Sequence, residues 1–174
     1  MIKIKKYKRI LSTNLLAKKL KKPEPWLVIM AEVQSKGYGR KRTSWFSPKG
    51  GLYFSIILPR SKIEDLQTLT ILAAFIIAKV IKENFELEPF IKLPNDVWVN
   101  GKKIAGVLTE NVVGKEVKFS VMGIGLNTNI SKFPRTLEDD ATSLKIELGK
   151  RVNNEKILKR IVKELKEQLK TISD

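Results

Sequence analysis

Two short segments of the sequence hold the residue types from which an anion-binding site can be built. In the first, Gly37 and Gly39 lie within the basic run 36–42. Glycine amides beside fixed cations suit a phosphate or another anion. Residue 42 is Arg where a dinucleotide-binding fingerprint has its third glycine, which argues against that fingerprint. A solvated basic loop is the alternative that this segment alone leaves open.

The second segment, residues 92–106, combines polar side chains with a tight turn. Asn100-Gly101 is typical of a two-residue hairpin turn because both residue types tolerate positive φ. Strand alternation from that turn sends Lys102 and Lys103 to opposite faces, so one of them can enter a site while the other stays in solvent. A plain turn at Pro94-Asn95-Asp96 and an exposed sheet lysine are the alternatives.

Three glycines, Gly106, Gly123 and Gly125, fall inside expected strands. An interior glycine weakens a strand unless backbone or ligand must approach closely, so these positions favour a nearby site. A β-bulge is the alternative reading.

The absence of Cys and His limits the available chemistry. It excludes disulfides, thiolate nucleophiles, Cys-ligated zinc and imidazole bases. The sequence also has no phosphate-binding P-loop, no His-Glu-x-x-His and no Gly-x-Ser-x-Gly motif. Catalysis must therefore use carboxylates, Lys, Arg, backbone amides or a bound cation.

The formal net charge of +16 fits more than one class of protein. It suits a nucleic-acid binder, since cations that neutralise phosphates dominate non-specific affinity. The lysines are, however, spread over the chain, and a Lys/Glu-rich, Cys-free composition also fits a thermophile with many surface ion pairs. With no bilayer-spanning run and no signal-type segment, we expect a cytoplasmic protein that does not enter a membrane.

The hydrophobic pattern predicts the elements that position these segments. Expected strands are 7–11, 27–33, 52–58, 90–93, 97–99, 103–110 and 117–126, and expected helices are 15–20, 65–84 and 154–172. Such a mixture predicts an α+β fold, with a mixed, largely antiparallel sheet packed against helices on one face. Its 174 residues can bury one core, so we expect a single domain spanning residues 1–174.

In order and spacing, a series of motifs resembles the biotin protein ligase family. They are Ser12-Thr13-Asn14, Ala31-Glu32-Val33-Gln34, Gly37-Tyr38-Gly39-Arg40, Trp45-Phe46-Ser47-Pro48, Lys92-Leu93-Pro94-Asn95-Asp96, Lys103-Ile104-Ala105-Gly106-Val107-Leu108, Gly125-Leu126-Asn127 and Ala141-Thr142-Ser143-Leu144. Each is short, but their order across most of the chain is specific. The resemblance implies a catalytic domain like those of class II aminoacyl-tRNA synthetases and biotin ligases.

The resemblance also implies roles for individual residues. The expected biotin-binding residues are Ser12, Thr13, Asn14, Gln34, Gly37, Tyr38, Gly39, Arg40, Lys103, Gly106 and Gly125. The expected nucleotide-binding residues are Arg40, Lys41, Trp45, Asn95, Lys103, Asn127 and Thr142. Lys103 and Arg40 are the expected catalytic residues, ATP with Mg²⁺ the expected cofactors, and Asp96 a candidate metal ligand within a ligand set that stays unknown.

The activity implied is adenylation of biotin by ATP, followed by transfer to a lysine of a biotin carboxyl carrier protein or domain. A homodimer through the sheet edges is also implied. Members of the family commonly carry a C-terminal SH3-like domain and some an N-terminal DNA-binding domain, so the chain is expected to be the catalytic core alone. Tyr38 stands where many members have Arg, Leu93 where Trp is usual and Thr43 where Arg is common.

Three other functions stay open at this point. A lipoate ligase or transferase shares the fold and the acyl-adenylate chemistry. A weakly active biotin-binding paralogue and a basic nucleic-acid binder are the alternatives from another class. Few aromatic residues lie outside apolar runs, so base-stacking platforms are not evident, and we expect no specific nucleic-acid partner.

Overall fold

A computed structural model describes residues 2–58 and 65–173 of the chain. Its elements are, in chain order, β1 (Ile4–Ile10), α1 (Thr13–Lys18), β2 (Val28–Gln34), the 3-10 turn η1 (Arg40–Arg42), β3 (Leu52–Leu58), α2 (Leu66–Phe85), β4 (Pro89–Lys92), β5 (Asp96–Val99), β6 (Lys102–Val113), β7 (Val117–Leu126), α3 (Leu144–Leu148) and α4 (Asn154–Ser173).

Among the described residues, seven strands form one sheet in the order β1-β2-β3-β7-β6-β5-β4. Only β1 and β2 pair in parallel; the remaining neighbours are antiparallel. The expected α+β class with a mixed, largely antiparallel sheet is confirmed.

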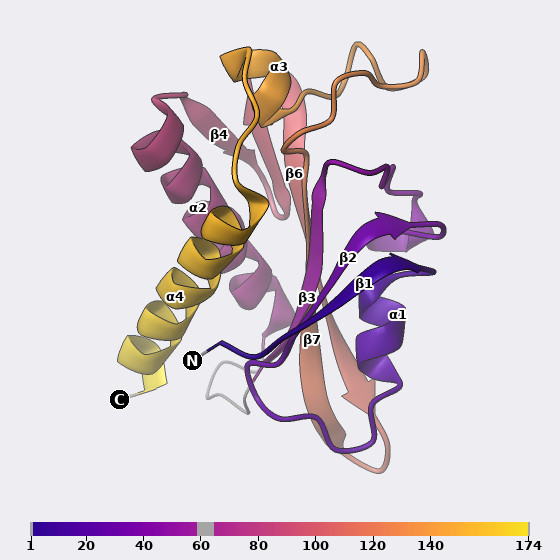
Figure 1. Cartoon of the computed structure of the whole chain (residues 1–174). Helices are drawn as coiled ribbons and strands as arrows, with labels where there is room; N and C mark the ends of the chain where they lie inside the picture. The colour runs from indigo at the N-terminus through magenta and orange to yellow at the C-terminus, as the bar shows by residue number, and fades with distance from the viewer. Residues whose placement is uncertain (1, 59–64, 174) are drawn as a thin grey trace.

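The helices lie on both faces of this sheet, so the expectation that only one face is covered was wrong. Helices α2 and α4 lie together on one face, and α1 lies on the other (Figure 1). The large core, which includes Phe54, Ile77 and Leu165, fills the space under α2 and α4. A smaller cluster, which includes Ala17 and Val121, lies under α1. The short α1 covers only part of its face, which leaves room for a cavity beside it.

Local sequence explains where the helices begin. Ser12 caps α1 by accepting a hydrogen bond from the amide of Leu15, and Asp65 caps α2 by accepting from the amides of residues 67 and 68. Ser143 caps α3 in the same way, and α3 ends at Gly149, whose φ of 69° favours glycine. Helix α3 was not predicted, because five residues show too little periodicity to be recognised.

Two N-terminal elements differ in position from the sequence prediction. Strand β1 covers residues 4–10 instead of 7–11, and α1 covers residues 13–18 instead of 15–20. The Lys-rich start of β1 belongs to an exposed edge strand, and its pairing with β2 determines where the strand begins. Because this start is mostly polar, the hydrophobic pattern did not predict the first three residues of the strand. Within residues 2–58 and 65–173, none of the helices is both long and apolar enough to cross a membrane.

Candidate active site

A cavity of about 330 Å³ lies on the sheet face that carries α1. Its walls come from the start of α1, the loop between β2 and β3, and the strands β5, β6 and β7. It is lined by Ser12, Thr13, Asn14, Gln34, Tyr38, Gly39, Arg40, Lys41, Thr43, Ser44, Trp45, Asn95, Asp96, Lys103, Gly106, Val107, Leu108, Gly123, Ile124 and Gly125. The two segments singled out by their chemistry, 36–42 and 92–106, therefore meet at one cavity.

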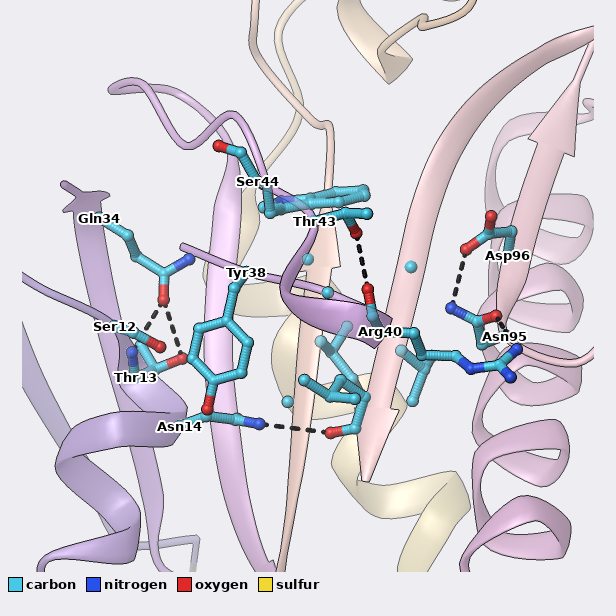
Figure 2. Close-up of a pocket in the computed structure, with 18 of the residues that line it drawn as sticks. Ser12, Thr13, Asn14, Gln34, Tyr38, Arg40, Thr43, Ser44, Asn95 and Asp96 are labelled. Carbon is cyan, nitrogen blue, oxygen red and sulfur yellow. Dashed lines mark hydrogen bonds between the residues drawn. The ribbon is translucent and has the colours of Figure 1, made fainter. Parts of the chain in front are cut away.

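The residues Ser12, Thr13 and Asn14 hold one end of the cavity through buried polar contacts. All three are almost fully buried. Gln34 Oε1 accepts a hydrogen bond from the amide of Thr13 (2.8 Å), and Gln34 Nε2 donates to Ser47 Oγ (3.0 Å). Figure 2 shows Gln34 and Thr13 together on the side opposite Asn95 and Asp96. A polar cluster with its hydrogen bonds largely satisfied is rigid, and rigidity suits recognition of a polar ring.

Asn14 is held from both ends of its amide. Its Oδ1 accepts from the hydroxyl of Ser55 (2.6 Å), and its Nδ2 donates to Glu110 Oε2 (2.9 Å) and, over a longer distance, to the carbonyl of Leu108 (3.4 Å). A methyl group at position 123 would overlap the Asn14 amide, which explains the glycine there. Ser55 and Glu110 were not identified from the sequence, because each comes from a distant strand and no local pattern marks it.

Glu110 is also the acceptor for Lys18 Nζ (2.7 Å) and for the Tyr38 hydroxyl (2.7 Å). Burial by itself raises the pKa of Glu110, but hydrogen bonds from Lys18, Asn14 and Tyr38 together bring that pKa below the ordinary value. Burial, followed by the bond to Glu110, raises the pKa of Tyr38. Glu110 is therefore ionised and Tyr38 neutral at neutral pH.

The loop between β2 and β3 is closed by short backbone contacts. The amide of Gly39 donates to Thr43 O (2.8 Å), and the amide of Trp45 donates to Gly37 O (2.9 Å). A side chain at Gly37 would lie within 3 Å of Trp45 O and Ser47 Oγ, so this turn requires glycine. Lys41 lies inside η1 with a φ of 51°, which forms the tight bend. Gly37 serves this turn and does not line the cavity.

Arg40 extends from this loop across the cavity toward β5 (Figure 2). Its Nη1 lies 3.4 Å from Asn95 Oδ1, and Asn95 Nδ2 in turn donates to Asp96 Oδ1 (3.0 Å). The guanidinium is exposed, and its side-chain hydrogen bonding within the described residues is limited to this long contact with Asn95. A cation on an exposed loop beside a cavity can bind an incoming anion without first breaking a strong ion pair.

Lys103 enters the cavity from β6, as strand alternation allowed. Its Nζ lies 2.7 Å from Asp96 Oδ2 and 5.2 Å from the centre of the Trp45 ring. Lys102 points away and donates to the carbonyl of Glu138 (2.8 Å). Asn100 and Gly101 in the adjoining turn have φ of 50° and 75°, which confirms the expected hairpin.

The glycines of β6 and β7 make space for an aromatic ring. Gly106 and Gly125 are register partners, and a methyl group at either would press on the Trp45 indole. The close approach expected at these two glycines is confirmed, but the group that approaches them is the Trp45 side chain and not a backbone segment or a ligand. The indole Nε1 is buried and has no hydrogen-bond partner among the described residues.

A second cavity of about 120 Å³ adjoins the first and shares Ser44, Trp45 and Lys103 with it. Its other lining residues are Phe46, Asn127, Phe133, Leu137, Asp140 and Ala141. Trp45, Phe46 and Phe133 give it aromatic walls, which suit a flat ring. Phe133 was not identified from the sequence, because it lies in an irregular segment.

Two residues expected at a nucleotide lie outside the main cavity. Asn127 is nearly buried and lines the second cavity. Thr142 is buried beneath a third, open cavity of about 380 Å³, and its hydroxyl donates to Glu147. The remaining expected site residues except Gly37 line the first cavity. Within residues 2–58 and 65–173, no cluster of three or more His, Cys, Asp or Glu could hold a metal ion by itself.

Comparison with known proteins places this chain in one family. The profile of the Biotin/lipoate A/B protein ligase family matches residues 6–127. The bifunctional ligase/repressor BirA of Bacillus subtilis (strain 168) is 37% identical over 145 residues, which make up 80% of this chain and 44% of that protein. The biotin--[acetyl-CoA-carboxylase] ligase of Mycobacterium tuberculosis is 27% identical over 150 residues, 82% of this chain and 54% of that protein.

Solved structures agree with the sequence comparison. The biotin protein ligase from Aquifex aeolicus, in complex with biotin and ATP, superposes with a TM-score of 0.91 at 31% identity, over 99% of this chain and 72% of that chain. Catalytic domains of the biotin protein ligase class therefore share this fold. The chain belongs to the Biotin/lipoate A/B protein ligase family, and it spans less than half the length of the Bacillus subtilis relative.

Proposed function

We propose that this chain is an ATP-dependent biotin protein ligase. It would join the biotin carboxylate to the α-phosphate of ATP and then pass the biotinyl group to a lysine of a biotin carboxyl carrier domain. The observation that carries the proposal is the position of Lys103, which lines two adjoining cavities. Its ammonium lies where the polar cavity of about 330 Å³, hereafter the larger cavity of the two, meets the aromatic second cavity of about 120 Å³. A cation at such a junction lowers the barrier to a reaction that joins two anionic groups, here a carboxylate and a phosphate.

The larger cavity is proposed to bind biotin. Biotin offers N–H donors and a carbonyl acceptor at one end and a carboxylate at the other. Ser12, Thr13, Asn14 and Gln34 supply polar groups at one end of the cavity, and Lys103 and Arg40 supply cations at the other. Gly106 and Gly125 are proposed to act through Trp45, while Gly37, Tyr38 and Gly39 shape the loop above.

The second cavity is proposed to bind the adenine ring of ATP. Its aromatic walls can stack on a planar base, and the Asn127 amide can both donate and accept hydrogen bonds. Asn95, Lys41 and Arg40 lie on the side where the phosphates would pass into the larger cavity. For Thr142 we propose only an indirect role, because its hydroxyl donates to Glu147.

The proposed mechanism follows from the charges. A carboxylate oxygen of biotin attacks the α-phosphorus, and pyrophosphate leaves with the electrons of the broken P–O bond. Both reactants are anions, so Lys103 and Arg40 reduce their repulsion and stabilise the charge that builds at the phosphate. A neutral carrier lysine then attacks the acyl carbonyl, AMP leaves and the amine loses a proton. No enzyme nucleophile is needed, in agreement with a chain without Cys or His.

Mg²⁺ is proposed to accompany ATP. Asp96 supplies one partly buried carboxylate at the cavity, which fits an ion that takes one or two carboxylates and completes its shell with phosphate oxygens and water. Such an ion neutralises phosphate charge when bound. The homodimer through sheet edges, the cytoplasmic location and the thermophilic source stay predictions from resemblance and composition.

The decisive experiment is exchange of labelled pyrophosphate into ATP, with biotin or lipoate supplied in parallel. The expected result is exchange that depends on biotin and is much weaker with lipoate, and it requires no knowledge of the carrier. Exchange with lipoate alone would move the chain to the lipoate branch of the family. Absence of exchange with either acid, in protein that is folded, would refute the proposed activity.

A further inference from the structure

Glu110 lies outside the lining of both cavities and yet contacts two residues that shape the larger one. Its side chain is 22% exposed and comes from β6. Oε1 accepts from Lys18, and Oε2 accepts from both Asn14 and Tyr38. The carboxylate therefore connects α1 with the loop between β2 and β3, and both of these segments line the larger cavity.

The first consequence concerns the orientation of Asn14. An ionised carboxylate can only accept hydrogen bonds, so the amide must turn its NH₂ group toward Glu110. Its carbonyl oxygen then points the other way, toward Ser55 and the space above Gly123. Glu110, with a weaker contribution from the carbonyl of Leu108 (3.4 Å), thereby orients the amide so that the cavity presents an acceptor at this place, which suits a ligand with N–H donors.

The second consequence concerns the loop. Tyr38 is fixed through its hydroxyl to Glu110. Two cations also lie over its ring, with Lys18 Nζ 5.7 Å and Arg42 Cζ 4.8 Å from the ring centre. A backbone bridge between Tyr38 and Ser44 extends this anchor to both ends of the basic turn. The hydrogen bond from Tyr38 to Glu110 thus attaches the loop that carries Arg40 to strand β6.

We propose that Glu110 is a positioning residue of the larger cavity, which orients the amide of Asn14 as an acceptor for a ligand N–H group and ties the Tyr38 loop over that ligand. The identity of the ligand as biotin rests on the proposed function. The anchoring of the loop does not, because it follows from contacts within the chain. Because the Asn14 amide and the Tyr38 loop are already ordered, less conformational entropy is lost when the ligand binds.

Glu110→Gln tests the proposal because it keeps the shape and replaces one acceptor with an NH₂ donor. The matched control is Glu164→Gln, which removes a largely buried carboxylate that pairs with Lys79 and Arg160 on the opposite sheet face. By calorimetry, Glu110→Gln is expected to weaken biotin binding about tenfold or more, the cost of losing a hydrogen bond to a charged group. The control is expected to stay within about twofold of the parent protein.

A pure loss of stability would lower activity without selectivity, so kinetics give a sharper readout. In pyrophosphate exchange, Glu110→Gln should raise the KM for biotin by a larger factor than it lowers kcat, because Lys103 and Asp96 are untouched and only the loop that carries Arg40 is loosened. Adding Asn14→Asp to Glu110→Gln exchanges the amide and the carboxylate between the two positions. The carboxylate at position 14 can then accept from the NH₂ group at position 110, and the cluster regains its negative charge. Binding in this double variant is expected to recover in part, whereas Asn14→Asp alone sets two carboxylates together and should bind worst.

Limited trypsin digestion tests the loop without any ligand. Glu110→Gln, and separately the milder Tyr38→Phe, should be cut faster after Arg40, Lys41 or Arg42 than the parent and the Glu164→Gln control, as followed by mass spectrometry. Cleavage at the parental rate in both variants, or biotin affinity unchanged in Glu110→Gln, would overturn the proposal. If the parent protein binds no biotin, the proposed function fails, and the digestion still decides the role of Glu110.

Discussion

The ammonium of Lys103 and the carboxylate of Asp96 form a 2.7 Å ion pair across β6 and β5, at the junction of the two cavities. Both side chains are partly exposed, so water screens the pair and it adds little to folding stability. Its value is positional: the rigid turn at Asn100-Gly101 and the Trp45 ring hold the cation in place until an anion arrives.

Lys103→Ala is therefore expected to lower the rate of adenylate formation by about 10²–10³-fold, comparable to the loss of one preorganised charge-stabilising group. The fold should stay intact, because a partly exposed lysine contributes little to the core. Lys102→Ala is the matched control, since Lys102 is the neighbour of Lys103 on β6 and points away from the cavity. The measurement is biotin-dependent pyrophosphate exchange beside a thermal melt. Equal loss in both variants would remove Lys103 from the site.

Arg40→Gly is expected to fail in a different way. The guanidinium lies on the loop and is only weakly held by Asn95, so it can retain the finished adenylate more than it promotes its formation. The variant should still form adenylate and release it early, which would label bystander lysines. Trapping the intermediate and comparing carrier with bystander labelling checks this. Retention equal to that of the parent protein would contradict the assignment.

The long regular elements could be predicted from the sequence. Strands β3 and β7 begin and end where the apolar runs do, and the helix expected over 154–172 is α4. The buried positions of these elements are occupied by apolar residues, and this gives a hydrophobic pattern that can be recognised in the sequence. The one-face expectation was wrong because α1 is too short to show a clear apolar stripe, and its cover of the second face depends on packing against Ile29 and Val121.

The site could be predicted in part for the same reason. Arg40, Lys103 and Asn14 lie in motifs with a recognisable order, and each lines the expected cavity. Glu110, Ser55 and Lys18 were missed because their roles depend on strand register and on contacts between residues 41 to 96 positions apart. A carboxylate inside a strand looks like an ordinary exposed residue until its partners are known.

The net charge gives a prediction about nucleic acids. Binding to duplex or single-stranded DNA should be weak, independent of sequence and steeply reduced by salt, because spread lysines contact phosphates without reading bases. Fluorescence anisotropy over a series of salt concentrations measures this. Tight, sequence-selective binding at physiological ionic strength would favour the nucleic-acid alternative.

The Glu110 cluster predicts how stability depends on pH. Although burial alone raises the pKa of Glu110, its three hydrogen-bond donors bring it below the ordinary value of 4.5. A lowered carboxyl pKa stabilises the fold above the unfolded-state pKa, and this stability is lost as the pH falls through the lowered value. Urea unfolding should thus show a free-energy difference between the parent and Glu110→Gln at pH 7 that shrinks below about pH 4.5. A pH-independent difference would show that Glu110 is not held by its charge.

The last prediction concerns Trp45 and Gly125. A methyl group at position 125 would overlap the indole nitrogen, and the strand backbone beneath it cannot move without disturbing the pairing with β3 and β6. In Gly125→Ala the ring must therefore leave its place between the two cavities. We expect a changed tryptophan fluorescence and ATP binding weakened about tenfold, the value of one aromatic contact.

Gly114→Ala is the control for this variant. The atoms nearest to its added methyl group would belong to the flexible side chain of Lys118, so the cavities should be unaffected. Titration with ATP followed by fluorescence and calorimetry distinguishes the two variants. If Gly125→Ala binds ATP as the control does while its fluorescence has changed, the Trp45 ring is displaced without cost, and the second cavity is not the adenine site.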